Sequence, residues 1–148
     1  RSLGLRAEQK TVLDGSGVSS VLGLVPGGLT LDQMAALVGK KLGKKVTALS
    51  DLDLAGLREQ LKQANDPSVR FIANFHRGPL FGKGGGHHSP IAGYLAEEDL
   101  VLVADVNATY RPWLVKSDRL LEALSTVDKV SGKKRGLLRI EAGVAPPP

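Results

Sequence analysis

The chain of 148 residues is long enough to bury the core of one domain, and its 20 Lys and Arg residues against 15 Asp and Glu give a formal charge of +5. Aromatic residues make up only 4% of the sequence, and none lies inside the basic runs Lys40–Lys45 and Lys133–Arg135, which argues against nucleic-acid binding by base stacking. Cys is absent, which excludes disulfides, Cys-type zinc sites and a thiol nucleophile within these residues.

The chain begins with Arg1 rather than Met, and it shows neither a signal peptide nor an apolar run long enough to span a membrane. We therefore expect no membrane partner, and we expect that an N-terminal part has been removed. Residues 1–28 are weakly patterned, residues 29–141 are predicted to form the domain, and the proline-rich tail 142–148 is predicted to be disordered. The compartment, with the cytoplasm slightly favoured, and the oligomeric state stay open.

Hydrophobic periodicity predicts helices alternating with strands. Thr30 and Gln33 form a capping box at the start of an apolar stripe, which is the strongest helix signal in the chain. Helices are predicted over residues 30–42 and 50–65, and a further one after a cap at Ser117 or Asp118. Strands are predicted over Lys45–Leu49, Val69–Phe75, Ile91–Leu95, Leu100–Val106 and Gly136–Ile140. This order predicts an α+β domain with an antiparallel sheet.

The stretch Gly84–Asp105 is where glycines, histidines and an acid converge on a strand pattern. The strands on either side of Ala96–Asp99 are predicted to form a hairpin in which the numbers of facing residues sum to about 194 or 195. At a sum of about 194, His87 is a diagonal same-face neighbour of Asp105, within side-chain reach. A slip of one residue puts the two on opposite faces, and the sequence leaves this register open.

A histidine beside a carboxylate on adjacent strands is the base and orienting half of an arrangement of nucleophile, base and acid. The alternative is that His87 caps a loop and Asp105 ends a strand at a turn. The glycines at 82 and 84–86 do not fit a phosphate loop, because Lys83 is followed by glycine rather than Ser or Thr and a strand follows. These glycines are instead expected to leave room beside His87.

Histidines at 76, 87 and 88 raise the question of a metal site. Adjacent residues of a strand point to opposite faces, so His87 and His88 cannot jointly chelate one ion in regular geometry. No preformed metal site is therefore expected.

The run GHHSPIAGYLAEEDLVLVADV, followed by LLEALSTVD and SGKKRG, closely resembles the phytochelatin synthase family, whose members carry G-H-x-S-P-[IL]-x-x-Y and then a D-V that ends the next strand. The resemblance runs from about Gly28 to Ile140. It implies a papain-like cysteine-peptidase fold, of which this chain holds the antiparallel sheet half with packed helices. It also implies a Cys-His-Asp triad in which the histidine is His87, the acid is Asp105 and the nucleophile segment is missing.

The same resemblance assigns Asp128 and Arg135 to the charged ends of a γ-glutamyl group. An acid for an ammonium and a planar guanidinium for a carboxylate are matched partners, although an ordinary surface charge pair is the alternative. The resemblance places three further residues near the site without fixing their roles: Asn74, His76 and Arg77. No role is carried over to His88.

The activity that the resemblance implies is attack on the Cys-Gly amide of glutathione, release of glycine, and transfer of γ-Glu-Cys to glutathione or to water. Heavy-metal ions such as Cd, Zn and Cu would enter as metal-glutathione thiolates, as partners rather than as a required cofactor. The loop Asn107–Trp113 departs from the family, where a basic and aromatic segment one residue longer is usual, and this favours hydrolysis. The alternative is a non-catalytic γ-glutamyl-binding relative, or one part of a two-chain assembly.

One segment near the start bears on the missing nucleophile. Ser16-Gly17-Val18 resembles the Cys-Gly-Val of the family, with serine in place of cysteine. Relatives place several tens of residues between this motif and the helix at Thr30, and Pro26 would cut a nucleophile helix short. We therefore expect these 148 residues alone not to turn over glutathione, with Ser16 kept as the alternative nucleophile.

Overall fold

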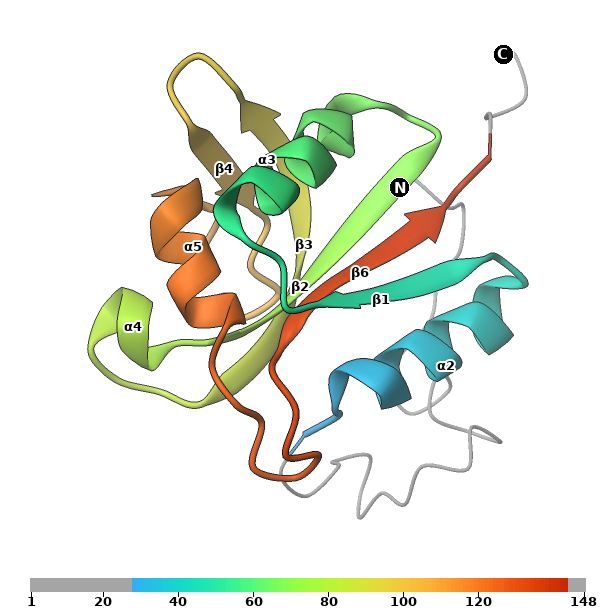
Figure 1. Cartoon of the computed structure of the whole chain (residues 1–148), viewed down its shortest axis with the longest axis horizontal. Helices are drawn as coiled ribbons and strands as arrows, with labels where there is room; N and C mark the ends of the chain where they lie inside the picture. Colours follow the sequence, from blue (N-terminus) through green and yellow to red (C-terminus); the bar gives the residue numbers. More distant parts are fainter. Residues whose placement is uncertain (1–27, 144–148) are drawn as a thin grey trace.

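The computed structural model describes residues 28–143, which form one six-stranded antiparallel sheet with helices on both faces (Figure 1). The strand order is β1-β6-β2-β3-β4-β5. The strands are β1 (Val46–Ser50), β2 (Val69–His76), β3 (Gly86–Leu95), β4 (Leu100–Val103), β5 (Trp113–Lys116) and β6 (Gly136–Glu141). The helices are α2 (Leu31–Leu42), α3 (Leu54–Lys62), the 3-10 helix η1 (Gln63–Asn65), α4 (Gly78–Phe81) and α5 (Ser117–Leu124). The predicted α+β class with an antiparallel sheet is confirmed.

Helix α2 begins as its sequence predicts. The Thr30 hydroxyl accepts from the Gln33 backbone N–H at 3.2 Å, and the Gln33 side chain accepts from the Thr30 N–H at 3.0 Å. The helix ends at Gly43, whose φ of 59° is the left-handed conformation that glycine adopts without a steric penalty. Local capping chemistry is thus sufficient to set both ends of this helix.

Helix α3 is shorter than the helix predicted over residues 50–65. Ser50 belongs to β1, and the Asp53 carboxylate caps the helix by accepting from the Gly56 N–H at 2.7 Å. After Lys62 the chain tightens into η1. The helix therefore begins where the Asp53 carboxylate satisfies a free backbone N–H, and not at residue 50 as the sequence pattern predicted.

The prediction of a side-chain cap for α5 at Ser117 or Asp118 is wrong. Ser117 is the first residue of the helix, and its buried hydroxyl accepts from Arg58 Nε at 3.0 Å. Lys116, the last residue of strand β5, stands at the cap position without a side-chain capping hydrogen bond, and its ammonium donates instead to the Glu98 carbonyl. Strand β5 and the short helix α4 were not predicted, since each has only 4 residues.

Alternation along the central strands gives the sheet two different faces. Phe71, Ala73 and Phe75 of β2 are buried on the face covered by α3 and α5, where the core lies. The other face packs against α2, and the Gly39 position lies against the Val46 side chain of β1. The core cluster consists of Leu57, Leu61, Val69, Phe71, Ala73, Phe75, Ile91, Tyr94, Val101, Val103, Leu120, Ala123, Leu124 and Leu137. No helix in the described range is long and apolar enough to cross a membrane.

The hairpin of β3 and β4 contains a bulge. Next to the turn, Tyr94 pairs with Val101 and Gly93 with Leu102, whereas beyond the bulge Ile91 pairs with Val103. Both of the registers expected from the sequence are therefore present, one on each side of the irregularity. Because an extra residue in one strand reverses its side-chain alternation, odd-numbered residues of β3 face the core before the bulge and even-numbered residues face it afterwards.

Gly136 stands where β6 passes between β1 and β2, paired with Ser50 on one side and Asn74 on the other. A methyl group at this position would overlap the backbone carbonyl of Leu49. We expect Gly136→Ala to lower the free energy of unfolding by about 3 kcal/mol, because neighbouring backbones must separate to admit it. Urea denaturation at 25 °C measures this loss.

The matched control is Gly85→Ala, because a methyl group there meets nothing within 4 Å and the residue does not have a positive φ. Equal losses of stability in the two variants would contradict the proposed backbone overlap.

Candidate functional site

The structure brings His87 and Asp105 together on the core face of the sheet. His87 lies at the start of β3, and Asp105 lies two residues beyond the end of β4, where continued pairing sets it opposite Ser89. His87 Nε2 is 3.3 Å from Asp105 Oδ1, an approach whose geometry falls short of a direct hydrogen bond. The imidazole packs edge-on against Phe75, with ring centroids 5.8 Å apart. The predicted proximity of the two side chains is therefore present, but the strand predicted over Leu100–Val106 ends at Val103, so that Asp105 follows the strand instead of lying inside it.

Asp105 is a buried carboxylate that is held from several sides. Its side chain is 0% exposed, and it accepts two hydrogen bonds from Arg77, at 2.8 and 3.0 Å. Trp113 Nε1 donates at 2.9 Å, and the Asn107 backbone N–H donates at 2.9 Å. Burial alone would raise the pKa of Asp105, but the hydrogen bonds from Arg77, Trp113 and Asn107 outweigh it and hold the pKa well below its usual range. The carboxylate is therefore ionised throughout the physiological range.

His87 is uncharged near neutral pH. Burial lowers the pKa of His87 and the positive charge of Arg77 lowers it further, while Asp105 only partly offsets these effects. Because an ionised carboxylate only accepts hydrogen bonds, the proton of the neutral ring is assigned to Nε2, facing Asp105. Nδ1 then carries the lone pair that can take up a proton.

His88 lies on the opposite face of the sheet, paired across the strands with Asn74. Burial, together with the neighbouring His87, lowers the pKa of His88 to about 4. Its Nε2 and the Asn74 amide nitrogen are buried without a hydrogen-bond partner among the described residues. The two adjacent histidines thus belong to separate environments, as strand alternation predicts.

Asp128 and Arg135 stand in the segment between α5 and β6, with Arg135 Nη2 3.7 Å from Asp128 Oδ2. Arg135 Nη1 donates to the Thr126 hydroxyl at 3.2 Å and to the Val127 carbonyl at 2.8 Å, whereas its Nε is buried without a partner in the described range. A methyl group at Gly86 would lie 2.8 Å from Arg135 Nη2, so the guanidinium packs against the residue before His87. This packing places the Asp128 and Arg135 pair at the His87 end of β3.

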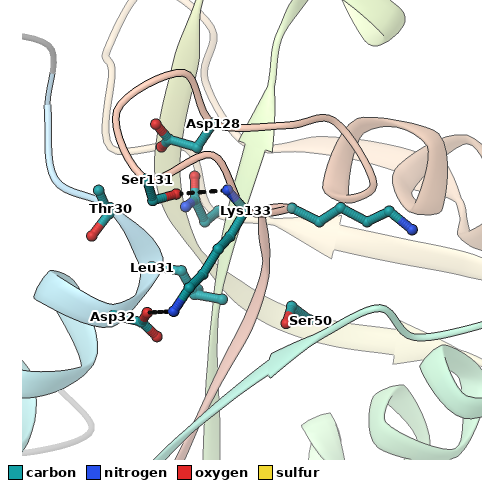
Figure 2. Close-up of a pocket in the computed structure, with 9 residues that line it drawn as sticks. Thr30, Leu31, Asp32, Ser50, Asp128, Ser131 and Lys133 are labelled. Carbon is teal, nitrogen blue, oxygen red and sulfur yellow. Dashed lines mark hydrogen bonds and ion pairs between the residues drawn. The ribbon is translucent and has the colours of Figure 1, made fainter.

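A pocket opens between this segment and the start of α2 (Figure 2). Asp128 and Ser131 line it from one side and Thr30 and Asp32 from the other, and Asn74 is also among the residues that line it. Lys133 and Lys134 also line the pocket, where Lys133 pairs with Asp32 at 2.9 Å and Lys134 pairs with Asp51 at 2.7 Å. Asp128 Oδ1 accepts from the Val130 N–H at 2.8 Å, and Oδ2 is the oxygen that approaches Arg135.

His76 and Arg77, whose roles the sequence left open, occupy different positions. His76 Nδ1 accepts from the Gly78 N–H at 3.0 Å and so helps to start α4. Arg77 reaches across to Asp105, a contact that sequence reasoning missed together with that of Trp113. In the sequence, Arg77 and Trp113 are only near the motif that contains His87 and Asp105. Nothing local indicates the contact of Arg77 with Asp105, because the two residues are 28 positions apart.

No group of three or more His, Cys, Asp or Glu side chains that could hold a metal ion occurs within residues 28–143. The Ser16 motif lies outside the described residues.

The lowered pKa of His88 makes stability depend on pH. Its usual value is 6.5 and its value in the folded chain is about 4, so the unfolded chain binds this proton more tightly. The stability that neutral His88 contributes is complete above pH 6.5 and is lost as the pH falls toward 4. We expect this loss to reach about 2 kcal/mol at pH 5 and His88→Asn to remove it.

Urea denaturation of both chains at pH 7 and pH 5 checks this expectation. His87 also has a lowered pKa, so a smaller acid-side loss is expected to remain in the variant. An identical pH dependence in the two chains would show that His88 does not cause the loss.

Comparison with known proteins places this site in a family. Residues 10–137 match the family model described as phytochelatin synthase. The chain is 38% identical to glutathione gamma-glutamylcysteinyltransferase 1 of Arabidopsis thaliana over 81 residues, which cover 54% of this chain and 17% of the relative. It is 43% identical to glutathione gamma-glutamylcysteinyltransferase 3 of Lotus japonicus over 70 residues, 47% of this chain and 15% of the relative.

A fungal relative gives a longer match. The glutathione gamma-glutamylcysteinyltransferase of Schizosaccharomyces pombe is 26% identical over 117 residues, 77% of this chain and 28% of the relative. The matches therefore span less than a third of the length of these relatives. Since the family model covers most of the sequence, including the His87, Asp105, Asp128 and Arg135 positions, the chain belongs to the phytochelatin synthase family.

Proposed function

We propose that this chain is the part of a glutathione-directed thiol acyltransferase or peptidase that carries the histidine, the acid and the γ-glutamyl site. The observation that carries the proposal is the approach of His87 Nε2 to Asp105 Oδ1, at 3.3 Å, in a chain of this family. The relatives are named glutathione gamma-glutamylcysteinyltransferases, and this name contains both the transferred γ-glutamylcysteinyl group and glutathione.

His87 would act as the general base and then as the general acid. Its Nδ1 takes the proton of a thiol, and the thiolate attacks the carbonyl carbon of the Cys-Gly amide of glutathione. As the C–N bond breaks, the imidazolium returns the proton to the leaving nitrogen of glycine, and a γ-Glu-Cys thioester remains. Asp105 holds the ring with Nε2–H toward itself and stabilises the transient charge.

The thioester is then resolved by an incoming nucleophile. The amine of a second glutathione gives the extended peptide, and water gives free γ-Glu-Cys, with His87 again accepting the proton. The loop Asn107–Trp113 differs from the usual basic and aromatic segment of the family, and this supports hydrolysis over transfer here. Metal ions would take part as metal-glutathione thiolates, as substrate rather than as a resident cofactor.

Asp128 and Arg135 would hold the charged ends of the γ-glutamyl group. Both side chains are about nine-tenths buried, which strengthens their interaction with charged ligand atoms. Asp128, which lines the pocket, would accept hydrogen bonds from an ammonium, and Arg135 would donate to a carboxylate. The placement of Arg135 against Gly86 supports a γ-glutamyl site at the same end of β3 as His87, with the pair next to His88 on the other face of the strand.

The thiol must come from outside these 148 residues, because the sequence contains no Cys. We propose that residues 29–141 form the sheet half of a papain-like fold, and that the nucleophile is carried by a helix of the other half. A non-catalytic γ-glutamyl-binding protein is the second candidate, and the absence of Cys in the sequence favours it.

Binding of the γ-glutamyl group is tested with Arg135→Ala and its neighbour Lys134→Ala. Losing a charge-assisted bond to a carboxylate costs roughly 1.5 to 3 kcal/mol, so Arg135→Ala is expected to weaken glutathione binding about ten- to a hundredfold. Lys134 pairs with Asp51 at the surface and is the matched control. Titration of glutathione followed by NMR measures both, and equal weakening would mean that the basic segment acts only through general charge.

Turnover separates the two candidates. The purified chain is expected to release no glycine from glutathione above the protein-free control, because His87 and Asp105 cannot replace a thiolate. The same chain joined to an upstream Cys-Gly helix of the family is expected to release it. Release by the chain alone that disappears in Ser16→Ala would make Ser16 the nucleophile, and binding without release in both forms would favour the non-catalytic protein.

A further inference from the structure

We propose that Arg77 is a positioning residue that fixes the Asp105 carboxylate in the orientation in which it meets His87. This inference rests on the proposed roles of His87 and Asp105, and it adds the residue through which the acid is held. Arg77 Nη1 donates to Oδ2 at 2.8 Å and Nη2 donates to Oδ1 at 3.0 Å. Two parallel bonds from a planar fork set both the position and the plane of a carboxylate.

Arg77 is itself held in place, so that it can fix the position of another side chain. Its guanidinium carbon lies 3.7 Å from the centroid of the Tyr110 ring, and its side chain is only 6% exposed. The Arg77 N–H donates to the Gly85 carbonyl at 2.9 Å, and the Arg77 carbonyl accepts from the Phe81 N–H at 2.8 Å. Aromatic stacking and backbone bonds therefore fix both ends of this side chain.

The glycine loop takes part in this arrangement. Gly84 has a φ of +95°, and a methyl group there would lie 2.9 Å from Arg77 Cβ. A glycine is thus needed both for the backbone conformation and for the close approach to the arginine stem. The loop that the sequence singled out for its glycines packs around the arginine that holds the acid.

Each oxygen of Asp105 already accepts two hydrogen bonds. Oδ1 accepts from Arg77 and from the Asn107 N–H, and Oδ2 accepts from Arg77 and from Trp113. His87 Nε2 approaches Oδ1 as a further donor, at 3.3 Å. The carboxylate therefore cannot turn to follow the imidazole, and the orientation that Arg77 imposes is the one that His87 meets.

The charges around His87 give Arg77 an effect that packing alone would not have. The charged and titratable groups next to the ring are Arg77, Asp105 and the adjacent His88, which lies on the other face. Arg77 opposes a proton on His87, and Asp105 favours one. Without the arginine, the attraction of the carboxylate would act unopposed, and His87 would bind its proton more tightly.

The test is NMR titration of the histidine side chains in the full chain, comparing the parent protein with Arg77→Met, Arg77→Lys and the control Arg119→Met. Arg119 is half exposed and donates to the Pro79 carbonyl of α4, so it is a nearby arginine that does not contact Asp105. Ring nitrogen shifts report which nitrogen of His87 carries the proton. The indole signal of Trp113, the single Trp of the sequence, reports that the variants are folded.

In the parent chain His87 is expected to be the Nε2–H tautomer. Arg77→Met is expected to raise the titration midpoint of His87 by about one pH unit, a tenfold gain in proton affinity, and to mix the tautomers. Arg77→Lys keeps the charge but not the two parallel bonds, so it is expected to hold the midpoint closer to the parent value while still mixing the tautomers. Arg119→Met is expected to match the parent chain.

The proposal is overturned if His87 keeps the parent midpoint and tautomer in both Arg77 variants. If Arg77→Met does not fold, the tautomer of His87 in Arg77→Lys decides alone. The measurement needs neither a nucleophile nor glutathione, so a chain that fails to process glutathione can still show the coupling of Arg77 to His87. Conversely, an active enzyme in which neither Arg77 substitution changes the titration midpoint or the tautomer of His87 would contradict only this inference and not the proposed function.

Discussion

Side-chain alternation along β2 and β3 decides which polar groups of this protein can meet. Phe75 and His87 pair across the two strands on the core face, and Asn74 pairs with His88 one position along on the other face. Two adjacent histidines are thereby placed in different chemical settings, one beside a carboxylate and one beside a buried amide. Neither histidine can take the place of the other without rotating the strand, which the ladders to β2 and β4 prevent.

The short strand β4 lies between two pairs of arginine and aspartate. Asp99, directly before the strand, accepts from Arg58 of α3 at 2.8 Å, and Asp105, just after it, accepts from Arg77 at the end of β2. The hydrogen bond from Arg58 holds the pKa of Asp99 well below its usual range, so both acids stay charged. Because ion pairs with buried members gain little net stability after desolvation, their main effect here is to fix where a strand of 4 residues begins and ends.

The sequence predicted those features that depend on neighbouring residues. The capping box of Thr30 and Gln33 and the alternation of β2 and β6 are local patterns, and they set their elements nearly at the observed ends. Strand β5 was missed because 4 residues are too few to show a period, and it exists only by pairing with β4. The contact of Arg77 with Asp105 was missed for a related reason, since no local pattern specifies which acid a distant arginine will reach.

The register of the site hairpin shows most clearly what a single sequence leaves open. Counting from the turn gave two registers, with His87 facing Asp105 in only one, and the molecule uses both, with the bulge between Ile91 and Gly93 separating them. A backbone irregularity of this kind has no strong residue signature at Ala92, so its position could not be derived from composition or periodicity.

This bulge changes how related sequences must be compared. Between the turn and Ala92 the even-numbered residues of β3 face the core, and between Ala92 and the site the odd-numbered residues do. A relative that lacks the extra residue of the bulge would keep the same histidine beside the acid, but would carry it one residue nearer to the turn along the chain. Alignments anchored at the hairpin turn would then assign the wrong member of the pair, whereas alignments anchored on the Ser89-Pro90 step and Asp105 would not. The histidine that corresponds to His87 is therefore identified by its distance from the acid across the sheet, and not by its distance from the turn along the chain.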